Sequence, residues 1–142
     1  MVFSGKFVHT INTNGRVSIP SNFRDNLKSA REGGKIMLRK VKNFVQAYPL
    51  EQWDLFFNSL PLKTADDRIA RRIISASSKD VEIDSNGRIL LPPEFRECFT
   101  SECVFLGLGN IFEIWNSAEW QSMNETALDR GKLSPEYDEI DL

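Results

Sequence analysis

Two separate stretches of the chain carry the same pattern of apolar and polar positions. Residues 11–24 and 83–96 align without a gap over 14 positions, seven of them identical, at an offset of 72. In the first stretch apolar residues alternate with polar ones, and in the second Ile89 and Leu91 occupy the same alternating positions, as in a strand with one buried face; a proline then precedes a Phe-Arg pair in both. The pattern predicts a repeated structural unit. Since two units of fewer than ~60 residues would each struggle to bury a core, we expect one core shared by both copies.

The elements around this phrase also occur twice. Residues 5–53 predict strand, hairpin, strand, short helix, strand, hairpin, strand and a helix start, and residues 80–123 predict the same order, with a C-terminal helix from residue 117. The second halves match at an offset of 67, because segments 48–53 and 115–120 both place a tryptophan five residues after an aromatic residue. We therefore expect a mainly β fold with short helices, a pseudo-two-fold barrel in which each copy lends its hairpin to the other and removes free sheet edges.

An Asn-Gly pair marks each hairpin turn. Both central residues of a type I′ turn need positive φ, which asparagine and glycine tolerate best. Asn14-Gly15 in the first copy and Asn86-Gly87 in the second therefore predict this turn type. Gly15 and Gly87 are the expected structural turn residues.

An arginine follows each turn, Arg16 in the first copy and Arg88 in the second. Alternation along the strand sends both outward, because the next residues, Val17 and Ile89, are apolar and are expected to face the core. An exposed guanidinium group can pair bidentately with guanine or hold a phosphate. A simpler interpretation makes Arg88 only the ion-pair partner of Asp84, four residues before it.

Residues 62–78 interrupt the repeat and predict a connecting helix. Thr64, with Asp67 three residues on, resembles a capping box, and Ile69, Ile73 and Ile74 form an apolar stripe. The arginines beside this apolar stripe could contact DNA or a neighbouring subunit, but water is the default for a charged helix face.

The composition argues against several classes of protein. No run of 18 or more apolar residues occurs, and the N-terminus lacks the features of a signal peptide, so we expect a cytoplasmic protein without a membrane partner. Cys98, Cys103 and His9 are too few for a structural zinc site, so no metal or cofactor is expected, and the cysteines are expected to be small buried hydrophobes. No paired carboxylates, nucleophile–base set or phosphate loop stands out, which argues against an enzyme.

The net charge of −2 conceals a gradient along the chain. Residues 1–49 carry +7, residues 50–99 carry −2 and residues 100–142 carry −7. Residues 134–142 form an acidic tail. A basic first third favours an anionic partner, although a solvated basic surface balanced by the acidic tail explains the charges equally well.

The repeated phrase, with the aromatic-x4-Trp helix start that follows it, resembles the MraZ family. The likeness rests on Asn-Gly-Arg, three residues and a proline, then Phe-Arg, given twice, and runs from about Phe3 to about Met123. The family motif in each module is Asp-x-x-x-Arg. The second copy has it as Asp84 to Arg88, whereas the first copy has Asn12 in the Asp position.

The resemblance implies two tandem SpoVT-AbrB modules on a swapped-hairpin, double-psi-like β-barrel. It also implies a bacterial transcriptional regulator that binds short direct repeats of double-stranded DNA in its own promoter, upstream of the division and cell-wall gene cluster. Such proteins assemble into homo-oligomeric rings. The expected location is the cytoplasm, in association with the nucleoid.

The resemblance makes Arg16 and Arg88 the expected DNA contacts. The charge gradient adds Lys6 or Lys40 as a helper of Arg16, and Asn14 of the first turn is also an expected DNA contact. We expect unequal hairpins: the first copy makes the main DNA contact through Arg16, and the second serves the barrel and the subunit interface.

One other function remains open, and a third is disfavoured. Antitoxins with one such barrel wrap a toxin with a disordered tail, so the chain can also be an antitoxin-like or ring-forming protein-interaction module without its own DNA specificity. Double-psi barrel decarboxylases cleave a Gly-Ser bond to make a pyruvoyl group, and this chain has no Gly-Ser dipeptide.

Overall fold

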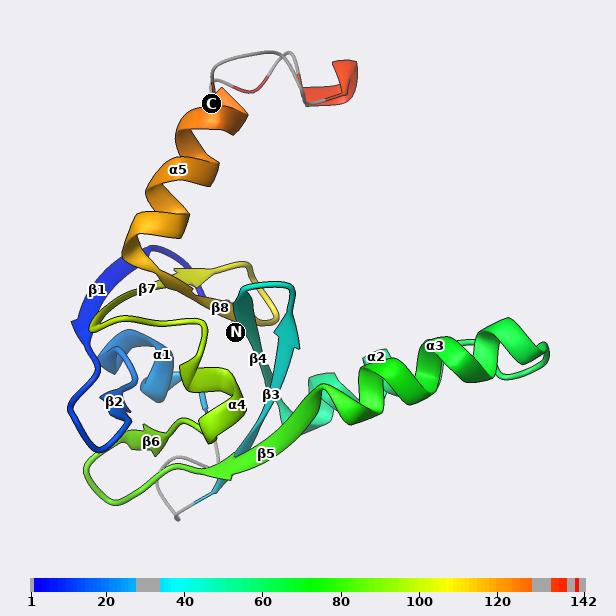
Figure 1. Ribbon diagram of the computed structural model, residues 1–142, viewed down its shortest axis with the longest axis horizontal. Coiled ribbons are helices and arrows are strands. Elements are labelled where there is room, and N and C mark those ends of the chain that lie inside the picture. Colours follow the sequence, from blue (N-terminus) through cyan, green and yellow to red (C-terminus); the bar gives the residue numbers. More distant parts are fainter. Residues whose placement is uncertain (1, 28–33, 129–133, 138–139, 141–142) are drawn as a thin grey trace.

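The computed structural model describes residues 2–27, 34–128, 134–137 and 140 (Figure 1). In chain order the elements are β1 (Lys6–Thr10), β2 (Arg16–Ser18), α1 (Ser21–Asp25), β3 (Lys35–Val41), β4 (Phe44–Pro49), α2 (Leu50–Ser59), α3 (Ala65–Ala76), β5 (Ser78–Glu82), β6 (Arg88–Leu90), α4 (Pro93–Arg96), β7 (Glu102–Gly107), β8 (Phe112–Asn116), α5 (Ser117–Leu128) and the short turn η2 (Pro135–Tyr137).

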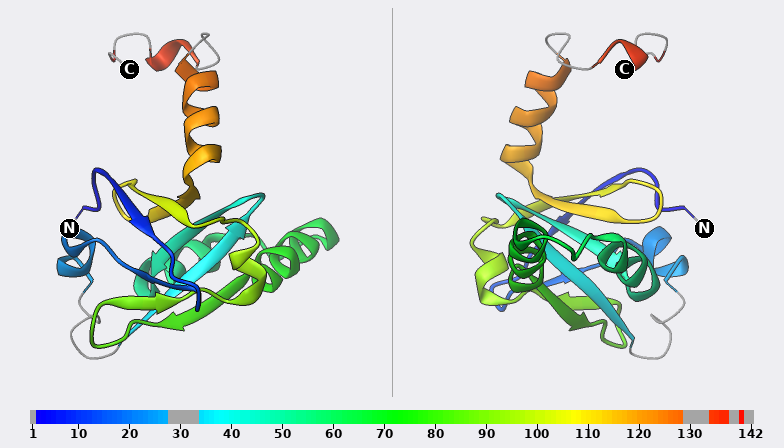
Figure 2. Two further views of the ribbon diagram at one scale, coloured as in Figure 1. Left: turned by 60° about the vertical axis from the view of Figure 1, so that its left-hand side comes forward. Right: turned by 90° about the vertical axis from the view of Figure 1, so that its right-hand side faces the viewer.

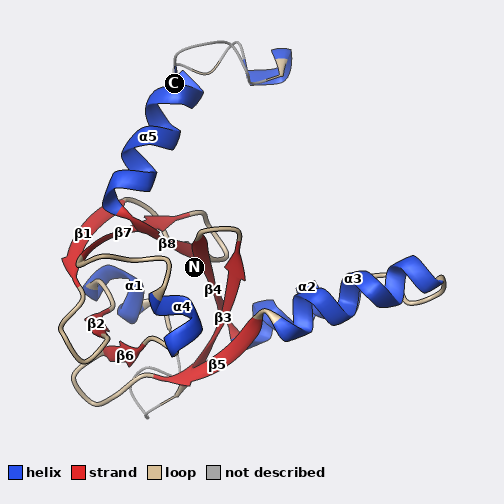
Figure 3. Ribbon diagram, viewed as in Figure 1, coloured by secondary structure: helices blue, strands red, loops and turns tan. Residues whose placement is uncertain are grey.

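The strands form one large sheet and one small ribbon, all antiparallel. The six-stranded sheet has the order β1-β7-β8-β4-β3-β5, and β2 pairs only with β6. The two edge strands of the large sheet, β1 and β5, contact β2 and β6, so the ribbon closes the open side of the curved sheet (Figure 3). The predicted mainly β fold with short helices and two tandem repeats is confirmed.

The two copies exchange their hairpins. β1 of the first copy pairs with β7 of the second, and β5 of the second copy pairs with β3 of the first. The registers are equivalent: Val8 lies opposite Val104, and Asp80 lies opposite Met37. These two pairs reproduce the sequence offsets of 72 and 67, so the pseudo-two-fold relation extends to individual residues.

The core lies inside this closed sheet. Phe23 of α1 and Phe95 of α4, the phenylalanines of the repeated phrase, are buried at 0% and 2% exposure. Phe23 contacts Phe105 and Phe112 of the sheet at centroid distances of 6.4 and 4.9 Å. Full burial of such a side chain stabilises the fold by roughly 1.5–3 kcal/mol. The short helices α1 and α4 therefore each insert a phenylalanine into the core, which holds the proline and the hairpin turn before each helix in place.

The hairpin turns differ from the predicted type. Only Gly15 of the first turn has positive φ, at 85°, and Asn14 does not. The Asn12 N–H donates to the Arg16 carbonyl, and the Gly15 N–H donates to the Asn12 carbonyl, both at 2.9 Å. The type I′ prediction is therefore wrong: this is a three-residue loop, a turn followed by a left-handed glycine. Asn12 Oδ1 favours it by accepting the N–H groups of residues 14 and 16.

Three helices project from the barrel. The pair α2 and α3 extends in one direction and α5 in another (Figure 2). α3 lies within the range expected for a connecting helix, and its capping box is confirmed, because the Asp67 N–H donates to Thr64 Oγ1 and the Thr64 N–H to Asp67 Oδ2, both at 3.0 Å. No residue of α3 is buried.

The structure describes only part of the expected acidic tail. Residues 134–137 and 140 are described, and the other tail residues lie outside the described part. Over all described residues, no helix combines the length and apolar character needed to cross a membrane.

Candidate nucleic-acid interface

The ribbon of β2 and β6 brings the two repeated arginines onto one surface. Val17 lies opposite Ile89 in this ribbon, and each is 1% exposed, facing the core. Arg16 and Arg88 alternate with them and are exposed on the outer face. The two hairpins therefore present one shared surface, not two separate ones.

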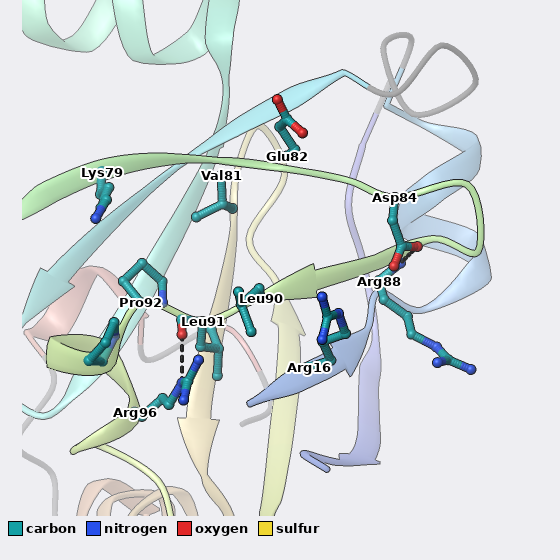
Figure 4. Close-up of a pocket in the computed structure, with 11 residues that line it drawn as sticks. Arg16, Lys79, Val81, Glu82, Asp84, Arg88, Leu90, Leu91, Pro92 and Arg96 are labelled. Atoms are coloured by element: carbon teal, nitrogen blue, oxygen red, sulfur yellow. Dashed lines mark hydrogen bonds between the residues drawn. The ribbon is translucent and has the colours of Figure 1, made fainter. Parts of the chain in front are cut away.

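A groove of about 440 Å³ runs beside this ribbon, between β5, β6 and the start of α4 (Figure 4). Its uncharged lining consists of aliphatic side chains and prolines. Its charged lining consists of Arg16, Lys79, Arg88, Arg96, Glu82 and Asp84. Four cationic groups against two carboxylates give the groove a positive balance, which suits an anionic ligand.

Asp84 shapes the second turn through its carboxylate. Its Oδ1 accepts the N–H groups of Asn86 and Arg88 at 2.8 and 2.9 Å. The hydrogen bond from the Arg88 N–H, followed by the bond from Asn86 and the charges of Arg88 and Arg16, holds the pKa of Asp84 below its usual value. In the described part of the chain no ion pair joins the two side chains, although the Arg88 charge contributes to the lowered pKa of Asp84. Asn12 makes the same turn contacts without the charge.

Arg96 is a site residue that sequence reasoning missed. It belongs to the second copy, yet its guanidinium packs against Gly15 in the first turn, where a side chain would collide with it. Its Nε donates a 2.7 Å hydrogen bond to the Leu91 carbonyl. Arg96 therefore fixes the junction between β6 and α4 and holds the turn that carries Arg16.

Arg24 of the first copy makes the equivalent contact with the turn of the second copy. It packs against Gly87 of the second turn and donates a 3.2 Å hydrogen bond to the Asn86 carbonyl. The signal in the sequence is the Phe-Arg pair, which is identical in both copies. An arginine kept at both equivalent positions, directly after a core phenylalanine, indicates a repeated contact.

The other three expected DNA contacts, Lys6, Lys40 and Asn14, lie in different parts of the structure. Lys40 Nζ donates to the Glu94 carbonyl at 3.3 Å and lies 3.8 Å from the Glu97 carboxylate, so it is engaged with α4. Lys6 is exposed at the far end of β1, roughly 20 Å from the first turn at about 3.3 Å per residue. Asn14 is exposed in the turn beside the ribbon. The structure thus places Asn14 in the turn that carries Arg16, Lys6 at the far end of β1, and Lys40 against α4.

The cysteines and the histidine have no metal-binding arrangement. Within the described residues no group of three or more His, Cys, Asp or Glu could hold a metal ion. Cys98 and Cys103 are both free, and burial raises the pKa of the Cys103 thiol to about 12. His9 Nδ1 lies 2.6 Å from the Ser18 carbonyl and can donate a hydrogen bond to it, which ties β1 to the end of β2.

Comparison with known proteins identifies the family. A family model described as "MraZ protein, putative antitoxin-like" matches residues 2–73 and again residues 74–136. A Transcriptional regulator MraZ of Shewanella amazonensis is 33% identical over 135 residues, covering 90% of this chain and 88% of that protein. One of Alkaliphilus oremlandii is 34% identical over 145 residues, covering 98% and 94%. One of Herpetosiphon aurantiacus is 30% identical, covering 96% of each chain. The chain therefore belongs to the MraZ family of transcriptional regulators, which are not enzymes.

Proposed function

We propose that the chain is a sequence-specific DNA-binding regulator of its own promoter, acting on short direct repeats upstream of a bacterial division and cell-wall gene cluster. The observation that carries this proposal is the exposure of Arg16 and Arg88 on one face of the β2–β6 ribbon. A two-stranded ribbon fits the major groove of B-DNA, where arginine pairs bidentately with guanine. The relatives named as transcriptional regulators support the same role.

The charges around the ribbon support an anionic partner. Lys79 and Arg96 add to the two ribbon arginines along the groove. The hairpin exchange also pairs strands of the basic first third with strands of the acidic second copy. Contacts from these groups to phosphates would release counterions, so DNA affinity should fall steeply with salt.

Assembly into a ring would align several ribbons with several DNA repeats. Ile69 and Ile73 lie one helical turn apart on α3 and are 49% and 64% exposed, and Leu62 just before the helix is 55% exposed. We assign this apolar stripe to contact with a second copy, because α3 projects from the barrel and buries none of its own residues. A head-to-tail contact closes into a ring, and linked ribbons bind repeated sites with avidity. The protein would then reside in the cytoplasm, on the nucleoid.

Footprinting on the DNA upstream of the gene tests the proposal. At moderate salt the wild type should protect a series of short repeats, and Arg16→Ala should weaken this protection. Absence of protected repeats with the wild type would contradict the proposal. The family description "putative antitoxin-like" keeps the interaction-module alternative in view, and stable co-purification of a second protein, without DNA binding, would favour it.

A further inference from the structure

The outer face of the ribbon carries two pairs of side chains. In the first pair Arg16 of β2 lies opposite Leu90 of β6, and in the second Ser18 of β2 lies opposite Arg88 of β6. Under the pseudo-two-fold relation the two arginines are equivalent, and so are Ser18 and Leu90. The two halves of the face therefore have the same arginine but differ at the second position, which is Ser18 in β2 and Leu90 in β6.

The hydrogen-bond pattern makes these neighbours close. The Ile19 N–H donates to the Gly87 carbonyl and the Leu91 N–H to the Gly15 carbonyl, both at 2.9 Å. These bonds flank the inward pair and leave the two outward pairs as non-hydrogen-bonded pairs. In such pairs the Cα atoms approach to about 4.5 Å, and the side chains lie closer together than in hydrogen-bonded pairs. Each arginine therefore has one cross-strand neighbour, Leu90 for Arg16 and Ser18 for Arg88.

The side chain of Leu90 is not part of the buried core. Its side chain is 42% exposed, whereas its neighbours in sequence, Ile89 and Leu91, are 1% and 0% exposed. In the major groove an aliphatic side chain can contact the C5-methyl group of thymine, while a serine hydroxyl can hydrogen-bond to any base edge. A leucine beside one arginine and a serine beside the other thus favour different bases.

We propose that Leu90 and Ser18 make the ribbon bind its DNA site in one orientation. Leu90 would contact a thymine methyl group next to the base pair read by Arg16, and Ser18 would bond a base edge next to the pair read by Arg88. This inference rests on the proposed function. A ribbon with unlike halves binds its site in one orientation, which fits repeats arranged head to tail and disfavours palindromes.

Replacing thymine with uracil at single positions of the bound repeat isolates the methyl group. With the wild type, uracil at one position should weaken binding about 3- to 5-fold, as expected for one lost methyl contact. Leu90→Ser should weaken binding to the thymine site by a similar factor and lose all sensitivity to uracil there. The slope of affinity against salt should not change, because phosphate contacts are untouched.

Selection from random DNA supplies the matched control. Leu90→Ser gives both halves of the ribbon a serine, and Ser18→Leu gives both a leucine. The first variant should select sites closer to an inverted repeat without the thymine, and the second should select a thymine in both halves. Circular dichroism checks that each variant folds.

The outcomes separate the two claims. If the wild type binds no DNA sequence selectively, the proposed function and this inference both fail. If the wild type binds selectively but is insensitive to uracil at every thymine, or if Leu90→Ser keeps the wild-type sensitivity, the inference alone is overturned.

Discussion

Arg96 packs its guanidinium group against Gly15, although the two residues belong to different copies of the repeat. A Cβ atom built on Gly15 would overlap Nε and Cζ of Arg96. Gly87 has the same relationship with Arg24. Each hairpin turn is therefore closed by a side chain from the other copy, so the two copies are expected to fold as one unit.

Gly15→Ala should lower the free energy of unfolding by about 2 kcal/mol or more. At a φ of +85° an L-residue is strained by roughly 1–2 kcal/mol, and the new methyl group must also displace Arg96. Urea unfolding measures the loss. Gly109→Ala is the matched control, because its φ is +94° but nothing lies within 4 Å of the added Cβ. Equal losses for the two variants would show that the contact with Arg96 does not matter.

Arg16→Ala should reduce DNA affinity more than Arg88→Ala. Asp84 lies in the turn that carries Arg88 and offsets part of its charge, whereas the equivalent residue in the turn of Arg16 is the uncharged Asn12. A lost bidentate contact to a base costs about 1–3 kcal/mol, so a loss of roughly tenfold or more is expected for Arg16→Ala. Fluorescence anisotropy with a labelled repeat at fixed salt measures both.

A remote arginine controls for the loss of charge itself. Arg72 is exposed on α3, away from the ribbon, and Arg72→Ala makes the same change in net charge. It should leave the affinity for a single repeat within about twofold of the wild type, since exposed charges beyond a Debye length of roughly 10 Å are screened. Identical losses for the two ribbon arginines would contradict the unequal hairpins.

Exchanging the acid and the amide of the two turns should change DNA affinity in opposite directions. Asp84→Asn keeps the side-chain oxygen that accepts two backbone N–H groups, as Asn12 already does, and removes a negative charge beside Arg88 and Arg16. Asp84→Asn should tighten DNA binding by a few-fold, and Asn12→Asp should weaken DNA binding by a similar factor. The reason is that one charge a few ångströms from another contributes about 0.5–1 kcal/mol in water. The effect should shrink in high salt. A loss of affinity with Asp84→Asn would contradict a purely electrostatic role.

The same carboxylate should make stability depend on pH in acid. Hydrogen bonds from the backbone lower the pKa of Asp84 in the folded state, so its stabilising contribution is fully present above the unfolded pKa of about 3.9 and is lost as the pH falls through the lower folded pKa. The stability of the wild type relative to Asp84→Asn should therefore be constant above about pH 5 and decrease below pH 4. Urea midpoints across this range measure it. A difference between the two proteins that does not change with pH would rule out this linkage.

The exchange of hairpins was predictable because it follows from repetition and edge protection. Two copies too small for separate cores must share one, and the offsets of 72 and 67 in the sequence reappear in the pairing of β1 with β7 and β5 with β3. The turn type was not predictable from the Asn-Gly pair alone. It depends on loop length, which is set by strand register and by the side chain of Asn12 two residues earlier.

The composition of the site was harder to predict than its central arginines. Arg16 and Arg88 meet only because β2 pairs with β6, a contact between residues that are far apart in the sequence. Lys40 carried the right charge, but its long side chain reaches the carbonyl of Glu94 on α4, and no local pattern encodes that contact. Positive charge in a sequence thus indicates a class of partner, whereas the pairing of strands decides which charges are free to meet it.

The exposed stripe on α3 should hold the assembly together. Ile73→Asp places a charge on a side chain that is 64% exposed, so the barrel should keep its stability while the contact between copies is lost. Light scattering after gel filtration should show a particle mass that falls toward the 16.3 kDa of one chain. Ser75→Asp is the matched control, since Ser75 is exposed on the opposite side of α3 and should leave the mass unchanged. Binding to a tandem array of repeats should weaken far more than binding to one repeat, because avidity is lost while each ribbon is intact. A wild-type protein that is already a single chain in solution, or an Ile73→Asp variant of unchanged mass, would contradict the assignment.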